Sequence, residues 1–257
     1  MVARPRPRRS RLARWSWWLA FLGVPVLLIA AFTHRFGLIS TPVMYLLVAT
    51  GFGLAFAGVI AAAASLNAIW RDGRSGFGIA MCGLIVGLAI LVVPAIAAWR
   101  IVTLPRIADI STDTVDPPAF AFAGMDGVRH AARPSPGDIA MQRASYPDIL
   151  SHRYPVGVTR VLEQARALAD QSGWHVLDEV QPVSADGTGR IEAVAMTPFF
   201  ANRNDVVIRV EPDGDGARVD VRSASRYVKH DLGVNAARIR AFLASLDVSL
   251  AGAIGEE

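Results

Sequence analysis

Three long apolar runs dominate the first hundred residues of the chain. They cover residues 15–33, 43–65 and 77–99, and none of them contains a charged side chain. Each run has the roughly 20 residues that an α-helix needs to cross a hydrocarbon core about 30 Å thick. Pro25 and Pro94 lie inside two of the runs, and membrane helices tolerate proline better than soluble helices do. The pattern therefore predicts three transmembrane helices.

Small residues at helical spacing mark where these helices are expected to pack. They are Gly53, Ala57 and Ala61 in the second run and Gly83 and Gly87 in the third. Small side chains let helix backbones approach closely, either within one chain or between copies in a homo-oligomer, and both arrangements remain open. The runs hold no acidic, basic or histidine side chain, which disfavours a transporter or a pump. We interpret the helices as an anchor.

The placement of arginines predicts the orientation of the anchor. The tail of residues 1–14 holds six arginines and the loop of residues 71–76 holds two, whereas the loop of residues 34–40 holds one. The positive-inside rule places the tail and the second loop in the cytoplasm, so three crossings place residues 100–257 outside it. A cleaved signal peptide would leave this orientation unchanged, and nineteen apolar residues favour an uncleaved first helix. We expect a multi-pass protein of the bacterial inner membrane with a periplasmic C-terminal domain.

The pattern changes twice after residue 100. Seven prolines punctuate residues 101–155, and because proline interrupts both helices and sheets, we expect this segment to be a mostly irregular lead-in. A regular core is expected over about residues 155–250. Its apolar residues first recur at spacings of three and four, which predicts an amphipathic helix over residues 158–169, and Gly173 is placed to end it.

Four strands and a second helix are expected next. The strands are predicted at residues 174–180, 190–200, 205–212 and 217–223, where apolar alternation is bounded by turn residues. The short sequence DGDG between the last two predicts a hairpin. The helix is expected to begin near Asn235, because asparagine is a good N-cap. We predict a small α+β domain whose mainly antiparallel four-stranded sheet carries both helices on one face.

Alternation also assigns the two faces of the sheet. One face is apolar, so both helices can cover it; its residues are Ile191, Ala193, Ala195, Val206, Ile208, Val210, Val219 and Val221. The other face is charged; its residues are Glu192, Arg209, Glu211, Arg218, Asp220 and Arg222. Antiparallel sheets commonly leave such a face in water, and we expect that here, with a ligand or partner surface as the alternative.

The distribution of charge restricts the partners. Residues 1–99 hold nine arginines against one acid, whereas residues 100–257 hold sixteen arginines and one lysine against twenty-one acids. The C-terminal half is therefore mildly acidic although the whole chain has a net charge of +4. Nucleic-acid binding needs a basic surface that neutralises phosphates, so we exclude nucleic acid. The lipid bilayer, an envelope protein and an anionic ligand remain as partners.

Cysteine and histidine give no sign of a metal or a cofactor. Cys82 is the single cysteine and lies inside the third apolar run, so neither an internal disulfide nor a cysteine-based metal site can form. His130, His152, His175 and His230 are scattered, without the spacing that brings metal ligands together. We expect neither a metal nor a cofactor.

The densest polar stretch, residues 221–242, supplies the candidate site. Seven residues in it are candidates for ligand binding: Arg222, Ser223, Ser225, Arg226, Asp231, Asn235 and Arg238. Arginine forks suit phosphate or carboxylate groups, and a helix N-terminus nearby favours negative charge. In the alternative interpretation the same residues pin the turn between strand and helix, with Arg226 and Arg238 paired to Asp205 or Asp231.

A hydrolase site in this stretch is disfavoured. Serine, histidine and aspartate are all present, but a catalytic triad needs the base within hydrogen-bond reach of the nucleophile. His230 and Asp231 are adjacent in the sequence, an arrangement in which the two side chains rarely pair productively. The nucleophile-elbow pattern GxSxG is also absent from the sequence.

Two segments resemble a known family. They are DISTDTVDPPAF, from residue 109, and the run from RIEAVAMT to RSASRYVKHDLGVNAARIRAFLASL, which ends near residue 248. The chain is similar over about residues 108–248 to the bacterial family catalogued as domain of unknown function 1499, and several members also carry membrane helices ahead of the domain. The resemblance implies no activity. Members often have paired acids where this chain has Asn204 and Asp205, which weakens any metal role for that pair.

Two functions from different classes follow from these features. The first is an inner-membrane protein whose exported domain binds or scaffolds a component of the cell envelope, and this one we favour. The second is an envelope enzyme that acts on an anionic lipid or glycan, with an Arg/Ser/Asp site where the last strand meets the last helix.

Overall fold

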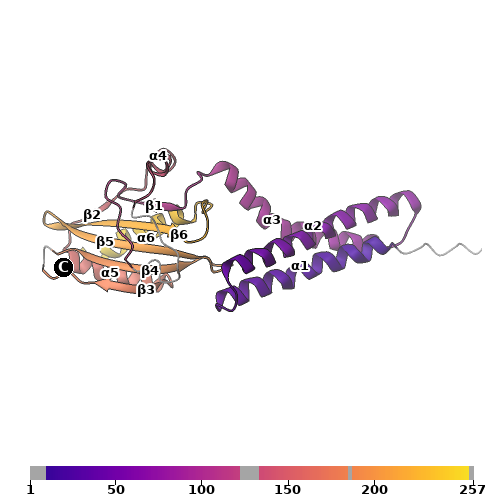
Figure 1. The fold of residues 1–257 in the computed structure, drawn as a ribbon, viewed down its shortest axis with the longest axis horizontal. Coiled ribbons are helices and arrows are strands. Elements are labelled where there is room, and N and C mark those ends of the chain that lie inside the picture. The colour runs from indigo at the N-terminus through magenta and orange to yellow at the C-terminus, as the bar shows by residue number, and fades with distance from the viewer. Residues whose placement is uncertain (1–9, 122–132, 185–186, 255–257) are drawn as a thin grey trace, which may run out of the picture. The chain divides into compact units, whose positions relative to one another are not determined.

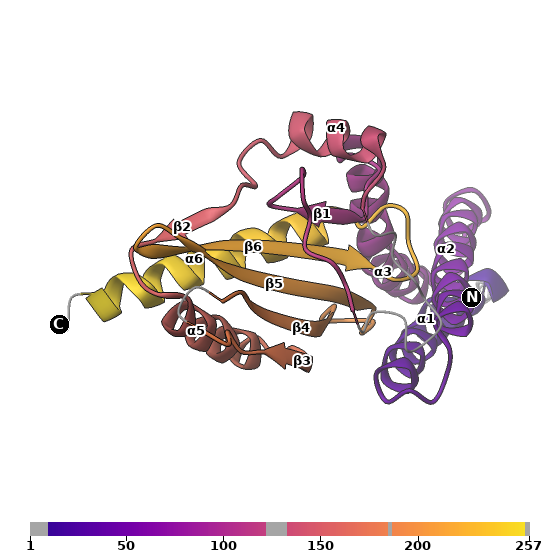
Figure 2. The same ribbon diagram turned by 60° about the vertical axis from the view of Figure 1, so that its left-hand side comes forward.

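A computed structural model describes residues 10–121, 133–184 and 187–254 of the chain. These residues form two compact units. One unit comprises the described residues up to Trp99 together with Pro198–Ala201, and the other comprises the rest of the described chain. Figures 1 and 2 show the elements of both.

Three long helices make up the first unit. They are α1 (Arg11–Arg35), α2 (Thr41–Asp72) and α3 (Phe77–Thr103), the last of which continues a few residues beyond the unit (Figure 1). Each helix contains one of the three apolar runs and is long and apolar enough to cross a membrane. Pro25 and Pro94 lie within α1 and α3 without ending them.

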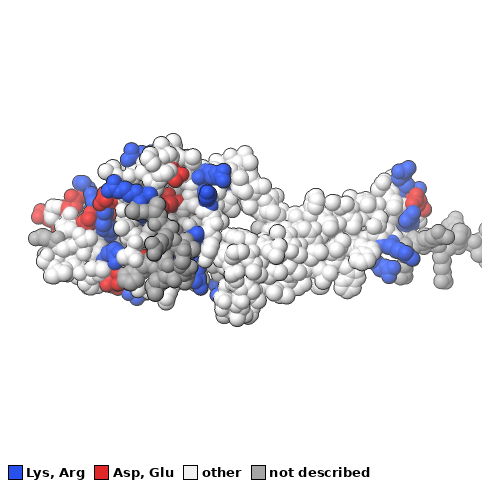
Figure 3. Space-filling view, in the orientation of Figure 1, with Lys and Arg blue, Asp and Glu red and all other residues white. Residues whose placement is uncertain are grey.

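Hydrogen bonds bring the start of α1 and the loop between α2 and α3 to the same end of the helices. The backbone N–H of Ser10 donates to the carbonyl of Ser75 at 2.9 Å, and the hydroxyls of Ser10 and Ser65 lie 2.8 Å apart. On the face that Figure 3 shows, most of the length of the helical unit carries no charge, and arginine side chains gather at one end of it. This is the arrangement that an orientation with both segments on one side of a membrane requires.

The helices approach one another at small residues. Some of these are the expected residues, and others are not. A Cβ atom on Gly83 would lie 2.8 Å from the carbonyl carbon of Ser16, and one on Gly87 would lie 3.1 Å from the carbonyl oxygen of Ala55. A Cβ atom on Gly53 would meet nothing within 4 Å. Within one chain, α2 instead buries Gly51, Ala55, Gly58, Ala62 and Ser65, which leaves packing between copies as the alternative for the stripe that holds Gly53. α2 carries two stripes of small residues, and only packing against its neighbours decides which of them is buried.

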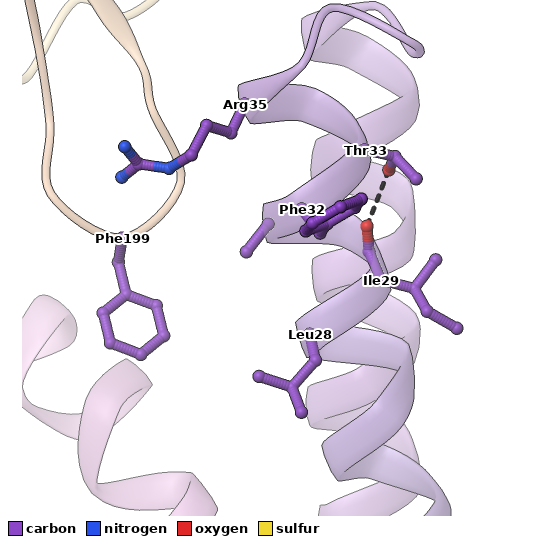
Figure 4. A pocket seen from close by; sticks show the side chains of 7 residues that line it. Leu28, Ile29, Phe32, Thr33, Arg35 and Phe199 are labelled. Atoms are coloured by element: carbon purple, nitrogen blue, oxygen red, sulfur yellow. Dashed lines mark hydrogen bonds between the residues drawn. The ribbon is translucent and has the colours of Figure 1, made fainter.

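The outer surface of α1 is apolar. Leu28, Ile29 and Phe32 are exposed, and Figure 4 shows them on the helix near its C-terminal end. The hydroxyl of Thr33 donates to the carbonyl of Ile29 at 2.6 Å, so its polarity is satisfied within the helix. Exposed apolar side chains with internally bonded polar groups are what a lipid-facing helix requires.

The second unit is built on one antiparallel sheet. Its strands are β1 (Asp109–Ser111), β2 (His152–Tyr154), β3 (His175–Val180), β4 (Gly189–Met196), β5 (Arg203–Asp213) and β6 (Gly216–Ser225). They run in the order β1-β6-β5-β4-β3, and β2 pairs with β6 further along the same edge as β1. The sheet has six strands, so the prediction of four was wrong. β1 and β2 have three residues each, too few for an alternating pattern to reveal.

The lead-in is also more regular than the sequence indicates. Besides β1 and β2 it contains helix α4 (Pro136–Ser145), which begins after the N-cap Ser135. The Ser135 hydroxyl accepts a hydrogen bond from the backbone N–H of Asp138 at 3.1 Å. The prolines therefore mark the ends of short elements rather than a wholly irregular chain, because proline is accepted at the first turn of a helix.

Helices α5 (Val158–Gln171) and α6 (Val234–Ile254) cover the apolar face of the sheet, as predicted. α6 lies along β6 (Figure 2). The core between them includes Leu162, Ile208 and Ile239, all essentially inaccessible. Trp174 stacks on Phe242 with ring centroids 5.3 Å apart. We call this side of the sheet the helix face.

The opposite, charged face of the sheet lies in water only in part, and the prediction was wrong for its buried residues. Glu192, Asp220 and Arg222 are each 0% exposed. A segment of the lead-in, residues 112–121, contacts this face, and we call it the strap. Its Ala121 N–H donates to the carboxylate of Glu192 at 2.8 Å. The sequence pattern identifies the charged face but does not show that an irregular segment covers it.

Ion pairs attach the strap to the sheet. Arg209 on β5 reaches Asp113 at 3.1 Å and Asp116 at 2.9 Å in the strap, and Asp220 on β6 at 3.0 Å. Burial alone would raise the pKa of the Asp113 carboxyl. The backbone N–H groups of Val115 and Asp116 and the charge of Arg209 outweigh burial, so its pKa lies below the usual range. Asp113 therefore holds the strap as a carboxylate that stays ionised at neutral pH.

Candidate functional site

The seven candidate residues lie where β6 passes into α6, which we call the corner. Strand alternation separates them into two groups. Arg222 points to the charged face, since its strand neighbours Asp220 and Arg218 do so, whereas Ser223 and Ser225 point to the helix face. The corner is therefore not one convergent site.

Arg222 ties β6 to β1 and the strap. Its Nε and Nη2 donate to the two carboxylate oxygens of Asp109 at 2.9 and 2.7 Å, and its Nη1 donates to the carbonyl of Pro118 at 3.1 Å. The guanidinium also lies over the ring of Phe120, 4.7 Å from its centroid. This fork-to-fork geometry is the strong form of an arginine–carboxylate contact, and it leaves the buried guanidinium no surface for an external anion.

Asn235 is the centre of the group on the helix face. Its Oδ1 accepts from the hydroxyl of Ser223 at 2.8 Å and from Nη1 of Arg238 at 2.6 Å. Its Nδ2 donates to the hydroxyl of Ser225 at 3.0 Å and to the carbonyl of Ala108 at 2.9 Å. The side chain thus uses both its donors and both its lone pairs. It links the first turn of α6, strand β6 and the segment ahead of β1.

Arg226 forms an ion pair with Asp205 of β5. Its Nε donates to both carboxylate oxygens at 3.0 and 2.9 Å, and its Nη2 approaches Oδ1 at 2.6 Å. The side chains are 5% and 1% exposed. The neighbouring Asn204 accepts a hydrogen bond from the Ser225 hydroxyl at 2.7 Å. The structure therefore uses Asn204 and Asp205 to hold the end of the sheet.

Asp231 shapes the turn into α6. Its carboxylate accepts from the backbone N–H of Gly233 at 3.0 Å and of Asn235 at 2.6 Å. Leu232 and Gly233 adopt φ angles of 57° and 78°, so the turn passes through the left-handed region. Burial raises the pKa of Asp231, although these N–H groups, His230 and Arg238 counteract it. The prediction that Asn235 caps α6 was wrong, because the helix begins at Val234 and Asp231 supplies the capping oxygens.

Arg238 differs from the other arginines of the corner. Its Nη1 is held by neutral oxygens, those of Ser223 at 2.9 Å and of Asn235 at 2.6 Å. Burial lowers the pKa of its guanidinium to about 10, and the charge of Asp231 acts in the opposite direction. Arg238 therefore remains charged at neutral pH and contributes a donor to the network around Asn235.

The arrangement does not activate a serine. Ser223 is fully buried and donates its hydroxyl proton to Asn235. His230 points elsewhere: its Nδ1 accepts from the N–H of Leu232 at 3.1 Å, and its Nε2 lies 3.3 Å from the carbonyl of Ile101. A nucleophile needs a base within hydrogen-bond reach. His230 bonds to neither Ser223 nor Ser225, so it is not such a base for either serine. What the corner does is join four segments of the domain.

Sequence reasoning missed two partners in the corner. Asp109 had not been connected with Arg222, because they are 113 positions apart and β1 is too short to be recognised. Ala108 contributes only a backbone carbonyl, which no side-chain pattern reveals. The pairing of Arg226 with Asp205, in contrast, was one of the expected alternatives.

We expect Asn235→Ala to lower the free energy of unfolding of the domain by about 2–4 kcal/mol, because several buried hydrogen-bonding groups lose their partner together. Urea-dependent proteolysis of the full chain measures this. Ala237→Ser, at an exposed position in the same helical turn, is the matched control, with an expected change within about 0.5 kcal/mol. An Asn235→Ala variant as stable as the control would show that the network contributes nothing.

The fold and the corner define a protein with three helices able to span a membrane, followed by an antiparallel α+β domain. A family model described as "Protein of unknown function (DUF1499)" matches residues 109–246, which is more than half of the chain. The chain belongs to this family, and the resemblance of its motifs is confirmed.

Two further comparisons complete the picture. Among solved structures, the crystal structure of CalU16 from Micromonospora echinospora is similar at 14% sequence identity and a TM-score of 0.22. The match covers 37% of this chain and 72% of that one. A search of curated proteins gave no match.

Proposed function

We propose that this protein is a multi-pass protein of the bacterial inner membrane that displays its α+β domain in the periplasm as a binding or scaffolding module. α1, α2 and α3 would form the anchor, with the arginine-rich tail in the cytoplasm. Support comes from the arginine distribution along the sequence and from the three apolar helices.

One observation favours a binding or scaffolding module over an enzyme: the polar groups of the corner bond to other groups of the same domain. Arg222 and Arg226 each hold a carboxylate of the domain itself with two nitrogens. Ser223 and Ser225 each bond to the side chain of Asn235. An enzyme that acts on an anionic lipid or glycan needs groups that remain available to substrate, whereas a rigid display domain needs the ties seen here.

Reporter fusions test the location of the domain. Alkaline phosphatase fused after Glu257 is expected to be active, since it folds only outside the cytoplasm, and green fluorescent protein at the same position is expected to be dark. A fusion after Gly73, in the loop between α2 and α3, is the matched control and should give the opposite pair of results. A fluorescent C-terminal fusion would contradict the proposed orientation.

Photo-crosslinking in cells tests the module. A photoreactive residue in place of the exposed Val248 or Leu150 is expected to give a discrete adduct with an envelope component. The same adduct should form in the Ser225→Ala background, because the hydroxyl has a structural role. An adduct that accumulates only in Ser225→Ala, as a trapped substrate would, supports the enzyme and contradicts the module.

A further inference from the structure

The domain is joined to α3 by a short tether. Residues 104–108 separate the end of α3 from β1, so even a fully extended chain spans at most about 20 Å. Trp99 and Arg100 stand together at the end of the third apolar run, a pairing typical of a membrane–water interface. If α3 spans the bilayer, the part of the domain beside the tether must lie close to the headgroups.

Hydrogen bonds fix the turn of residues 226–233 beside this tether. The N–H of Asp231 donates to the carbonyl of Ile107 at 3.3 Å, and the N–H of Ser225 donates to that of Ala108 at 2.8 Å. The imidazole of His230 contacts the carbonyl of Ile101, in the last turn of α3, at 3.3 Å. These bonds hold the turn beside the point where the chain leaves α3.

The hairpin between β4 and β5 ends on the same side of the sheet. Strand register pairs Asn204 with Ser225 and Met196 with Arg203, so this hairpin connects β4 and β5 at the end of the sheet where β6 ends. The loop between β3 and β4 lies at the other end, because Gly189 pairs with Val210. We call the tether, the hairpin tip of residues 196–203 and the turn residues 226–230 the membrane-proximal end.

Charge is unevenly divided between this end and the rest of the domain. The three segments hold four Lys or Arg residues and no acid, although residues 100–257 as a whole carry a net charge of −4. Arg106, Arg203 and Lys229 are exposed, and Lys229 is the only lysine of the chain. Basic residues beside a bilayer are attracted to anionic lipid headgroups.

Exposed aromatic and apolar side chains accompany these charges. Phe199, in the hairpin tip, is 73% exposed, and Met196 and Tyr227 are exposed as well. Aromatic side chains are enriched at the headgroup level of membranes, where an apolar ring and polar surroundings are both accommodated.

We propose that the membrane-proximal end docks on the anionic headgroup layer of the bilayer that α3 crosses. Phe199 enters the interface, and Arg106 and Lys229 contact lipid phosphates. This inference rests on the proposed function, because it requires α3 to span. It adds that the domain is held against the membrane surface rather than suspended on its tether.

Lipid-borne quenchers test the docking on the full chain in nanodiscs. An environment-sensitive fluorophore is attached at Pro198→Cys in a Cys82→Ser background. The phosphatidylglycerol discs contain a lipid whose doxyl group lies at a shallow depth and quenches the fluorophore. We expect the probe at position 198 to be quenched at least twofold more than one at Val183→Cys, an exposed apolar position at the far end of the sheet. Phe199→Ser should remove at least half of that difference.

Charge reversal tests the recognition of headgroups. Arg106→Glu combined with Lys229→Glu is expected to reduce quenching at position 198 in phosphatidylglycerol discs. The docking equilibrium constant should fall about fivefold for each positive charge that is removed. In phosphatidylcholine discs the double variant should equal its parent. Arg240→Glu, an exposed arginine on α6, is the control and should have no effect in either lipid.

A separate probe distinguishes failure of the docking from failure of the anchor. A fluorophore on the native Cys82, within α3, should be quenched by a doxyl group deep in the acyl chain if α3 spans. If the probe at Cys82 is quenched but the probe at position 198 is quenched no more than the probe at position 183, the docking proposal is overturned and the anchor is not. No quenching at Cys82 overturns the anchor, and with it both proposals.

Discussion

Replacing Arg226 with alanine is expected to lower the free energy of unfolding of the sheet domain by about 3–5 kcal/mol. The substitution leaves the carboxylate of Asp205, 1% exposed, without the guanidinium that compensates its charge. A buried charge that loses its partner retains its full desolvation cost. The effect should appear in urea-dependent proteolysis of the full chain as a lower transition midpoint.

Two further variants identify the cause of this loss. Asp205→Leu combined with Arg226→Met removes both charges, and it should recover most of the stability because well-packed apolar groups replace buried ion pairs at little cost. Arg240→Ala breaks an exposed pair with Asp148 and should cost no more than about 1 kcal/mol. Equal losses in Arg226→Ala and Arg240→Ala would show that the buried pair has no special role.

The parts of the fold that follow from local periodicity could be predicted from the sequence. Strands β3–β6 and helices α5 and α6 each have a period of two or of about 3.6, and the assignment of Ile191, Ile208 and Val221 to the face under the helices is confirmed. The three apolar helices follow from length and composition alone. In each case the information lies within one element.

The parts that depend on contacts between distant segments could not be predicted. β1 is defined only by its pairing with β6, through the register of Ile110 opposite Ser223. The burial of Glu192 and Asp220 depends on the strap, and charged side chains ordinarily indicate solvent. On α2, the exposed Gly53 and the buried Gly51 are chemically identical, so neighbouring helices alone decide between them.

For the corner, the sequence supplied the residues and part of their division between the two faces of the sheet, but not all of their partners. Alternation along β6 already implies that Arg222 and Ser223 point to opposite faces, which argues against a single pocket. The capping role passed from Asn235 to Asp231 because the left-handed turn at Leu232 and Gly233 starts α6 one residue earlier than expected. Such a turn has no clear sequence signal when one of its two residues is leucine.

Arg222→Ala is expected to have the second large effect, about 3–5 kcal/mol, and to release a defined part of the structure. Arg222 is the largest fully buried side chain of the described chain, and it contacts Asp109 of β1, Pro118 and the ring of Phe120. Without it, β1 keeps its short ladder to β6 and the two bonds between Ser111 and Gln142, and the strap loses a bond near its C-terminal end.

Hydrogen exchange measures that release directly. In Arg222→Ala the amides of β1 and of strap residues 112–121 should exchange at least tenfold faster, while those of β4 change less, because local opening requires only the edge of the sheet to separate. Arg218→Ala, on the same strand and face but 34% exposed, is the matched control and should leave β1 protected. Faster exchange spread evenly over β1 and β4 would mean that the substitution lowers global stability only, and that Arg222 does not specifically hold the strap.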